Sequence, residues 1–197
     1  MNLQKSKSVA MLLMLAASAL ATPQAAAPRP SPDLVITAPS GQTTPLSSFR
    51  GKVVVLEFFF LRSPHCLELA QTLNKLNTEL GPRGLQPVAV AFPAPGSDAN
   101  GPMVTSMVDY FKLSYPVGYT TKQSIDTYFG RSGNQLLRIP QIVVIDRAGL
   151  IRAQSGLKYD PVLENHDSLR NLLENLLTEN PAAGGARKPA AVSKSQR

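Results

Sequence analysis

The only cysteine of the chain lies in a short motif whose residue types can support thiol chemistry. Residues 63–66 read Ser-Pro-His-Cys, and Cys66 is the single cysteine among 197 residues. Ser63 is a good helix N-cap and Pro64 suits the first helical position, so the motif predicts a helix start with Cys66 in the first turn. Unpaired backbone N–H groups and the helix dipole favour a thiolate there, and a protonated His65 would favour it further.

A second interpretation of the same motif involves no chemistry. A buried cysteine behaves as a small apolar side chain, and burial raises the pKa of its thiol. Ser63 would then be a plain N-cap, and His65 a solvated residue of the first turn. The motif by itself is compatible with both interpretations.

An acidic residue stands inside the apolar run that precedes the motif. Residues 53–59 read VVVLEFF, which is nearly continuous and rich in β-branched and aromatic residues, so they predict a buried central strand. An ionised Glu57 in such a strand is costly unless it is paired. Glu57 could serve as the base of the thiol, with a carboxyl pKa raised by burial, or it could face outward at a sheet edge.

Apolar periodicity and turn residues place further elements around this strand and helix. The predicted elements are a short edge strand at 34–37, a helix from 63 to about 80, a strand at 85–92, a helix at 102–113, an extended segment at 115–119, a helix at 122–129, a hairpin at 141–146 and 150–154, and a helix from 160 to about 177. A β-α-β unit followed by a hairpin and a helix indicates an α/β fold with a mixed central sheet and helices on both faces.

The two ends of the chain differ in composition from the region between them. Residues 1–21 resemble a secretory signal peptide with a basic start and an apolar run too short to span a bilayer comfortably, and a retained membrane anchor is the alternative. Residues 22–32 predict a Pro/Ala linker, residues 33–179 the folded domain, and residues 180–197 a basic disordered tail. We therefore expect a periplasmic or extracellular protein, with no stable membrane span after signal cleavage.

The net charge of +7 does not indicate a nucleic-acid surface on the folded domain. Its excess of basic residues lies in the two end segments, while the region between them carries equal numbers of acidic and basic residues. One cysteine and two histidines cannot build a zinc site of the usual type, and no Gly-rich phosphate loop is apparent. We expect no metal, no cofactor and no nucleic-acid partner.

Three segments together resemble the thioredoxin-fold redoxins, in particular the exported TlpA/ResA-like thiol–disulfide proteins and the related AhpC/TSA proteins. GKVVVLEFFFLRSPHC is similar to the family pattern GK-x-V-x-x-x-F-W-x-x-W-C-x-x-C. Arg138-Ile139-Pro140 is similar to the family's hydrophobic residue and cis-proline, and IVVIDRAGLIR to the hairpin that follows. The resemblance covers roughly residues 33–177 and implies a thioredoxin-like three-layer α/β/α sandwich.

The resemblance also implies roles for particular residues. Glu57 aligns with the buried acid that shuttles a proton to the second cysteine. A cis Pro140 would face the active site and, with Ile139 and Pro64, line a substrate groove. In the family the first cysteine is the exposed nucleophile, and here that position holds Ser63 while Cys66 takes the second position. A two-cysteine redox cycle within this chain is therefore excluded.

Three functional hypotheses follow, and we favour the first. A monothiol redoxin, an oxidoreductase of the thiol–disulfide type, would form mixed disulfides between Cys66 and partner proteins or low-molecular-weight thiols, and an external thiol would resolve them. Its site would consist of Cys66, Ser63, His65 and Glu57. A binding module without chemistry would instead take up a partner's extended segment beside Pro140 by strand addition.

The remaining hypothesis is a one-cysteine peroxidase that acts on peroxide. Peroxiredoxins use Thr/Ser-x-x-Cys, and the spacing of Ser63 and Cys66 fits that pattern. This chain has Phe59 where they carry a proline and Pro140 where they place an arginine, so Arg62 or Arg138 would have to substitute. Both the redoxin and the peroxidase hypotheses predict a low pKa for the Cys66 thiol.

Overall fold

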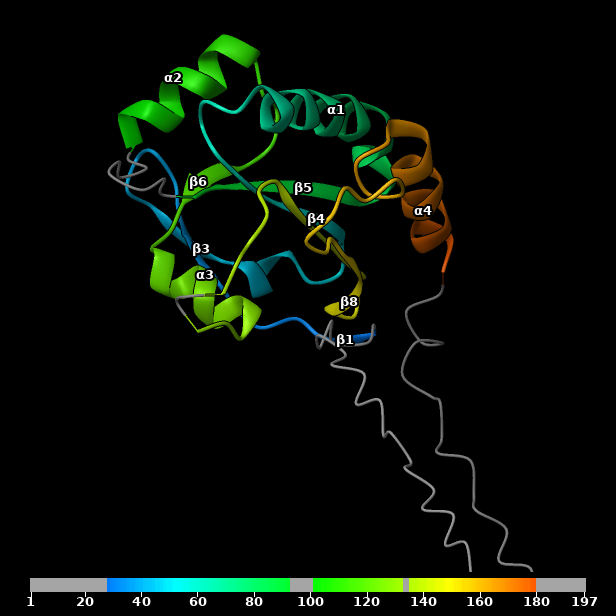
Figure 1. Cartoon of the computed structure of the whole chain (residues 1–197). Helices are drawn as coiled ribbons and strands as arrows, with labels where there is room; N and C mark the ends of the chain where they lie inside the picture. Colours follow the sequence, from blue (N-terminus) through cyan, green and yellow to red (C-terminus); the bar gives the residue numbers. More distant parts are fainter. Residues whose placement is uncertain (1–27, 93–100, 133–134, 180–197) are drawn as a thin grey trace, which may run out of the picture.

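A computed structural model describes residues 28–92, 101–132 and 135–179, and the expected signal peptide, most of the expected linker and the basic tail lie outside these residues. The strands are β1 (Arg29–Pro30), β2 (Val35–Thr37), β3 (Thr43–Pro45), β4 (Val53–Phe59), β5 (Leu85–Ala91), β6 (Val117–Tyr119), β7 (Gln141–Ile145) and β8 (Leu150–Gln154), and the α-helices are α1 (Pro64–Leu80), α2 (Gly101–Phe111), α3 (Lys122–Phe129) and α4 (His166–Thr178). The strands form one mixed sheet in the order β1-β8-β7-β4-β5-β6-β2-β3 (Figure 1).

Helices cover both faces of this sheet, which confirms the predicted α/β sandwich with a mixed sheet. Helices α1, α2 and α4 lie on one side and α3 on the other (Figure 1). The two buried clusters take alternate residues of the central strands: Val53, Val55 and Phe59 pack in the cluster of α1, and Val54, Leu56 and Phe58 in the cluster of α3. This alternation follows from the two-residue period of a strand.

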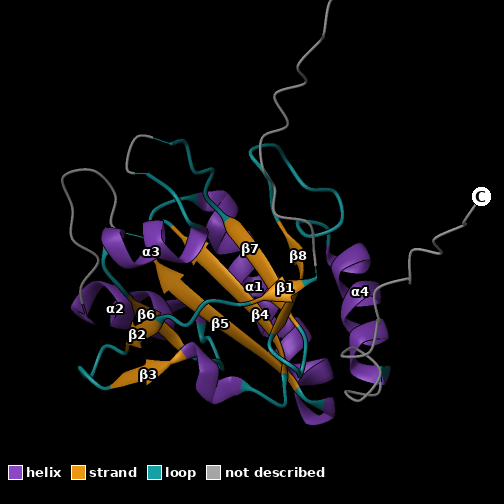
Figure 2. Cartoon of the chain, turned by 90° about the horizontal axis from the view of Figure 1, so that it is seen from below, coloured by secondary structure: helices purple, strands orange, loops and turns teal. Residues whose placement is uncertain are grey.

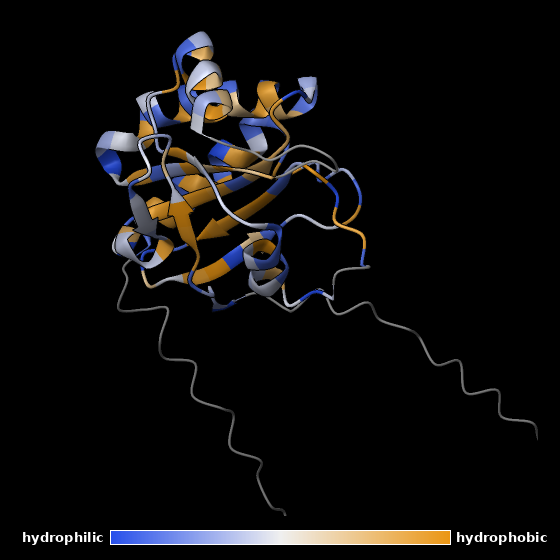
Figure 3. Cartoon of the chain, turned by 90° about the vertical axis from the view of Figure 1, so that its left-hand side faces the viewer, coloured by the Kyte–Doolittle hydropathy of each residue, from blue (hydrophilic) through white to orange (hydrophobic). Residues whose placement is uncertain are grey.

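Strand β4 lies in the middle of the sheet, which explains its continuous apolar sequence. It pairs in parallel with β5 and antiparallel with β7. All seven of its residues are buried because neighbours and helices cover both of its edges and both of its faces. Figure 2 shows the central strands crossing the molecule between the helices, and Figure 3 shows hydrophobic colour concentrated in the same layer.

Helix α1 begins where the Ser-Pro pair predicts it. Ser63 is the N-cap and its side chain accepts a hydrogen bond from the Cys66 backbone, with Pro64 in the first turn. The buried face of α1 consists of Cys66, Leu69, Ala70, Leu73, Leu76 and Leu80. The helix passes into a 3-10 turn that ends at Gly84, whose φ of 105° lies in the left-handed region that favours glycine.

The last helix begins later than the sequence predicts. Asp160 does not cap a helix; its side chain accepts hydrogen bonds from the backbone N–H groups of Val162 and Leu163 in a local turn. Helix α4 starts at His166, and Asn165 is its N-cap. An Asp-Pro pair suits a turn as well as a helix start, and here the turn occurs first.

The sheet also contains two strands that were not predicted. The predicted edge strand, β2, is not at the edge, because it lies between β6 and β3. The edge strand β3 reads TTP and carries no apolar alternation that could indicate it. At the other edge, Arg29–Pro30 of the expected linker pairs with β8. No helix in the described ranges is long and apolar enough to cross a membrane.

Candidate functional site

Cys66 lies in the first turn of α1, at the carboxyl end of β4. The residue is fully buried, and its backbone N–H donates to the Ser63 Oγ at 3.4 Å. Burial raises the pKa of the Cys66 thiol, and the hydrogen bonds of Ser63 and the Phe60 backbone offset this only in part. The direction is opposite to the one expected from the helix start, because loss of hydration outweighs the favourable position.

Glu57 is buried in the same core as the thiol. The residue has no exposed surface, and it lies on the face of β4 that also carries Val55 and Phe59. Neither carboxyl oxygen has a hydrogen-bond partner among the described residues. Burial raises the pKa of the Glu57 carboxyl well above its ordinary value. The alternative in which Glu57 faces outward at a sheet edge is wrong, since β4 is central.

A tyrosine that the sequence did not single out also lies near this carboxyl. Tyr115 is buried, and its hydroxyl donates to the backbone oxygen of Ala70 on α1 at 3.0 Å. Burial and the charge of Glu57 both raise the pKa of the Tyr115 phenol. The same charge of Glu57 also raises the pKa of the Cys66 thiol. Glu57 is therefore close enough to act electrostatically on both groups.

The loop before β7 carries the proline that the resemblance singles out. The Ile139–Pro140 peptide bond is cis, and Pro140 is buried. The loop leads into Gln141, which pairs with Phe58 near the carboxyl end of β4, so it lies at the same end of the sheet as the start of α1. Ile139 packs against the core cluster that contains Cys66. Pro64, in contrast, is exposed.

A charged cluster joins this loop to the first turn of α1. Arg138 makes a two-point contact with Glu164, with Nη1–Oε1 and Nη2–Oε2 distances of 2.5 and 2.8 Å. His65 Nε2 lies 2.9 Å from the same Oε2. The Asp160 backbone N–H donates to Oε1 at 2.8 Å. His65 thus faces an acid, which neither interpretation of the motif included.

Glu164 is the member of this cluster that the sequence did not indicate. It lies in the turn before α4, 26 positions after Arg138, and no periodicity or motif connects the two residues. Burial acts to raise the pKa of the Glu164 carboxyl, but hydrogen bonds from Arg138 and the Asp160 backbone outweigh it and hold the pKa below its ordinary value. The hydrogen bonds with Glu164 raise the pKa of Arg138.

The arrangement provides one nucleophile and one cation near it. The charge of Arg138 lowers the pKa of the Cys66 thiol, whereas Arg62 is exposed in the loop before α1. Arg138 is therefore the arginine that can stabilise charge on the sulfur. Within the described part of the chain, no group of three His, Cys, Asp or Glu side chains could hold a metal ion.

Solved structures similar to this chain share its fold. A thiol:disulfide interchange protein of the thioredoxin family from Chlorobium tepidum TLS is 21% identical with a TM-score of 0.61, and the match covers 77% of this chain and 98% of that one. A thiol:disulfide interchange protein from Bacteroides sp. is 18% identical with a TM-score of 0.62, covering 81% and 95%. The thioredoxin domain of a thiol-disulfide oxidoreductase from Bacteroides vulgatus is 18% identical with a TM-score of 0.61, covering 78% and 99%.

The sequence comparisons point to the same group. No curated protein matches the chain. The model of the Redoxin family matches residues 24–172, which is well over half of the sequence. This match includes β4, the Ser-Pro-His-Cys motif, the cis-proline loop and the hairpin of β7 and β8. The chain therefore belongs to the redoxin family and has its thioredoxin-like fold.

Proposed function

We propose that this chain is an exported redoxin that takes part in thiol–disulfide exchange through Cys66 alone. The observation that carries the proposal is the fully buried Glu57, whose carboxyl oxygens have no hydrogen-bond partner among the described residues. A buried polar group without a partner destabilises the fold by about 1–3 kcal/mol. Strongly perturbed titratable groups concentrate at functional sites, and this one lies in the core that contains the only thiol.

The chemistry takes place in two exchange steps. Cys66 loses its proton, and its sulfur attacks a partner disulfide, forming a mixed disulfide while the second partner sulfur leaves as a thiolate. An external thiolate then attacks the partner's sulfur in the mixed disulfide, and Cys66 leaves and regains a proton. After the second step the attacked partner sulfur is joined to the external thiol by a disulfide, the other partner sulfur is a free thiol, and Ser63 contributes no sulfur to either step.

The surroundings of the thiol support these steps. Burial brings the pKa of Glu57 closer to that of a thiol, so a proton passes between the two groups at a lower energetic cost than with an exposed carboxylate. Arg138 offsets part of the negative charge that develops on sulfur. Since Cys66 is fully buried, attack requires movement of the first turn of α1 or of the cis-proline loop. We therefore expect slow exchange in the resting protein.

The exposed apolar side chains favour a protein partner over a small thiol. The loop before β7 and the segment between β8 and α4 meet through Arg138 and Glu164. These two segments carry four large exposed apolar side chains: Leu136, Leu157, Tyr159 and Val162. Two of the similar solved structures are named as thiol:disulfide interchange proteins, which supports protein thiols and disulfides as substrates. The signal-like residues 1–21 support export, and residues 33–179 form the domain that would carry out the exchange.

The test is reaction of the native protein with an aromatic disulfide that releases a coloured thiol. We expect one equivalent of released thiol per chain between about pH 6 and about pH 9, faster at higher pH because the thiolate is the nucleophile. A mass adduct on Cys66, absent from Cys66→Ala, identifies the site. Reaction only after unfolding would contradict the proposal. Oxidation of Cys66 by peroxide at a much higher rate than by the disulfide would favour the peroxidase.

A binding module without chemistry is the second candidate, and the complete burial of Cys66 favours it. It predicts that Cys66→Ala changes the free energy of unfolding but leaves binding of a partner unchanged. Thiol–disulfide exchange predicts instead that Cys66→Ala abolishes covalent capture of the partner, because a mixed disulfide cannot form without the sulfur.

A further inference from the structure

We propose that Glu164 is a positioning residue for Cys66, a role that rests on the proposed thiol–disulfide function. Its buried carboxylate binds Arg138 and His65 at the same time. Arg138 precedes the cis-proline by two positions, and His65 precedes Cys66 by one. Glu164 thereby connects the two segments that flank the thiol, and its two-point contact fixes the orientation of the Arg138 guanidinium.

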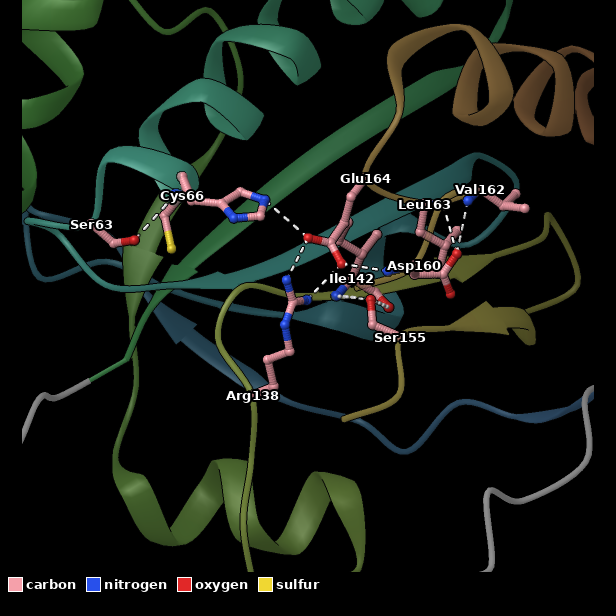
Figure 4. Close-up of polar contacts among 10 residues, drawn as sticks. Ser63, Cys66, Arg138, Ile142, Ser155, Asp160, Val162, Leu163 and Glu164 are labelled. Atoms are coloured by element: carbon pink, nitrogen blue, oxygen red, sulfur yellow. Dashed lines mark hydrogen bonds and ion pairs between the residues drawn. The ribbon is translucent and has the colours of Figure 1, made fainter. Parts of the chain in front are cut away.

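Each carboxylate oxygen of Glu164 makes two polar contacts. Oε1 accepts from Arg138 Nη1 at 2.5 Å and from the Asp160 N–H at 2.8 Å. Oε2 accepts from Arg138 Nη2 at 2.8 Å and lies 2.9 Å from His65 Nε2. Figure 4 shows Glu164 between the Cys66 end of α1 and Asp160, with Arg138 reaching it from the loop before β7. A two-point arginine contact fixes direction as well as distance.

Burial distinguishes this ion pair from the others in the described residues. The side chain of Glu164 has no exposed surface, whereas the acids of the other ion pairs expose between 12% (Asp146) and 87% (Asp167). Exposed pairs contribute little to stability, and a buried carboxylate is costly to desolvate. This unfavourable desolvation occurs beside the only thiol of the chain, at a position where an apolar side chain would give a similar or higher stability.

Arg138 is the link between Glu164 and the sulfur. Two charged groups change the pKa of the thiol: Glu57 of β4 raises it, and Arg138 of the cis-proline loop lowers it. Tyr115 interacts electrostatically with Glu57, and His65 directly precedes Cys66 on α1. Arg138 already exposes 22% of its side chain, so without Glu164 it is free to turn toward water. The thiol would then lose the cation that lowers its pKa.

The experiment reads the pKa of Cys66 directly in the full chain. Because the chain has one cysteine, ¹³C-labelled cysteine gives a single Cβ resonance, and its shift follows ionisation of the thiol without any partner. We expect Glu164→Gln to raise the Cys66 pKa enough to lower the thiolate fraction at a fixed pH by about threefold or more, which is a shift of about half a pKa unit. Asp126→Asn is the matched control, because Asp126 also binds two cations, Lys122 and Arg131, within and just after α3.

Two further variants test whether Glu164 acts through Arg138. Arg138→Met should raise the Cys66 pKa by a similar amount, and adding Glu164→Gln to it should raise that pKa no further. An unchanged pKa in Glu164→Gln, or full additivity in the double variant, would overturn the proposal. If Glu164→Gln does not fold, Arg138→Lys serves instead. Lysine keeps the charge but not the two-point contact, so we expect a raised Cys66 pKa, and an unchanged one would overturn the proposal.

The test of the Glu164 role and the test of the proposed function can fail independently of each other. If the wild-type protein does not react with the aromatic disulfide but the Cys66 pKa depends on Glu164 as described, the positioning role holds and the thiol–disulfide function fails. If the wild-type protein reacts and the pKa is indifferent to Glu164, the function holds and the positioning role fails.

Discussion

The buried carboxyl of Glu57 makes the stability of this protein depend on pH in an unusual direction. Its pKa in the folded state is raised well above its ordinary value by burial. Between the unfolded and folded pKa values, the folded chain holds a proton that the unfolded chain has lost. Stability therefore falls as the pH rises through this window, by up to about 1.4 kcal/mol for each pH unit.

The informative variant is Glu57→Gln, which keeps the shape of the side chain and removes its ionisation. A neutral amide at this site is also unpartnered, so at about pH 4.5 we expect the two proteins to have similar free energies of unfolding. Above that pH the variant should become the more stable protein, and its advantage should grow by about 1.4 kcal/mol for each pH unit until the folded-state pKa of Glu57 is reached. Other titrating groups contribute to both proteins and cancel in the difference.

Urea unfolding followed by circular dichroism at several pH values between about 4.5 and about 8 measures this difference. Glu68→Gln is the matched control, because Glu68 is exposed on α1 and the same chemical change there should show no such slope. A difference between wild type and Glu57→Gln that does not vary with pH would refute the reasoning, since it would mean that Glu57 ionises equally in both states. In the same variant the pKa of Cys66 should fall, because the charge of Glu57 raises it.

Three other substitutions have defined outcomes. Ser63→Ala should lower the free energy of unfolding by about 1 kcal/mol in urea titrations through loss of the N-cap, and it should raise the Cys66 pKa, because the Ser63 hydrogen bond lowers it. Ser63→Cys should allow an internal disulfide with Cys66, measured as the loss of both free thiols after mild oxidation. In the control variant Ser48→Cys, which adds a cysteine at an exposed position, both thiols should stay free. Leu173 is fully buried on α4, and Leu173→Ala should lower the free energy of unfolding by about 2–5 kcal/mol in calorimetry or urea titration. The Cys66 pKa should not change, and a shifted Cys66 pKa would show that packing at this distant core position affects the site.

The central elements of the fold could be predicted from local sequence. The strand at 53–59, the helix after Ser63 and the hairpin after Pro140 each carry a strong local pattern, because burial on both faces, an N-cap and a turn each demand particular residue types nearby. Strands β1 and β3 could not be predicted, since strands of two or three residues, Arg-Pro and Thr-Thr-Pro, bury too little at a sheet edge to leave a pattern. The start of α4 was misplaced because Asp160 satisfies backbone donors in a turn as well as it could in a helix.

The site was predictable only in part. The sequence by itself determined that one thiol is present, that Ser63 replaces the first cysteine of the family motif, and that Glu57 lies in an apolar strand. The tertiary structure decided that the thiol is buried with a raised pKa, because hydration depends on everything packed around the helix start and not on the helix alone. It also decided that Glu164 joins His65 and Arg138, since contacts between segments distant in sequence arise only when the sheet brings their loops to one end.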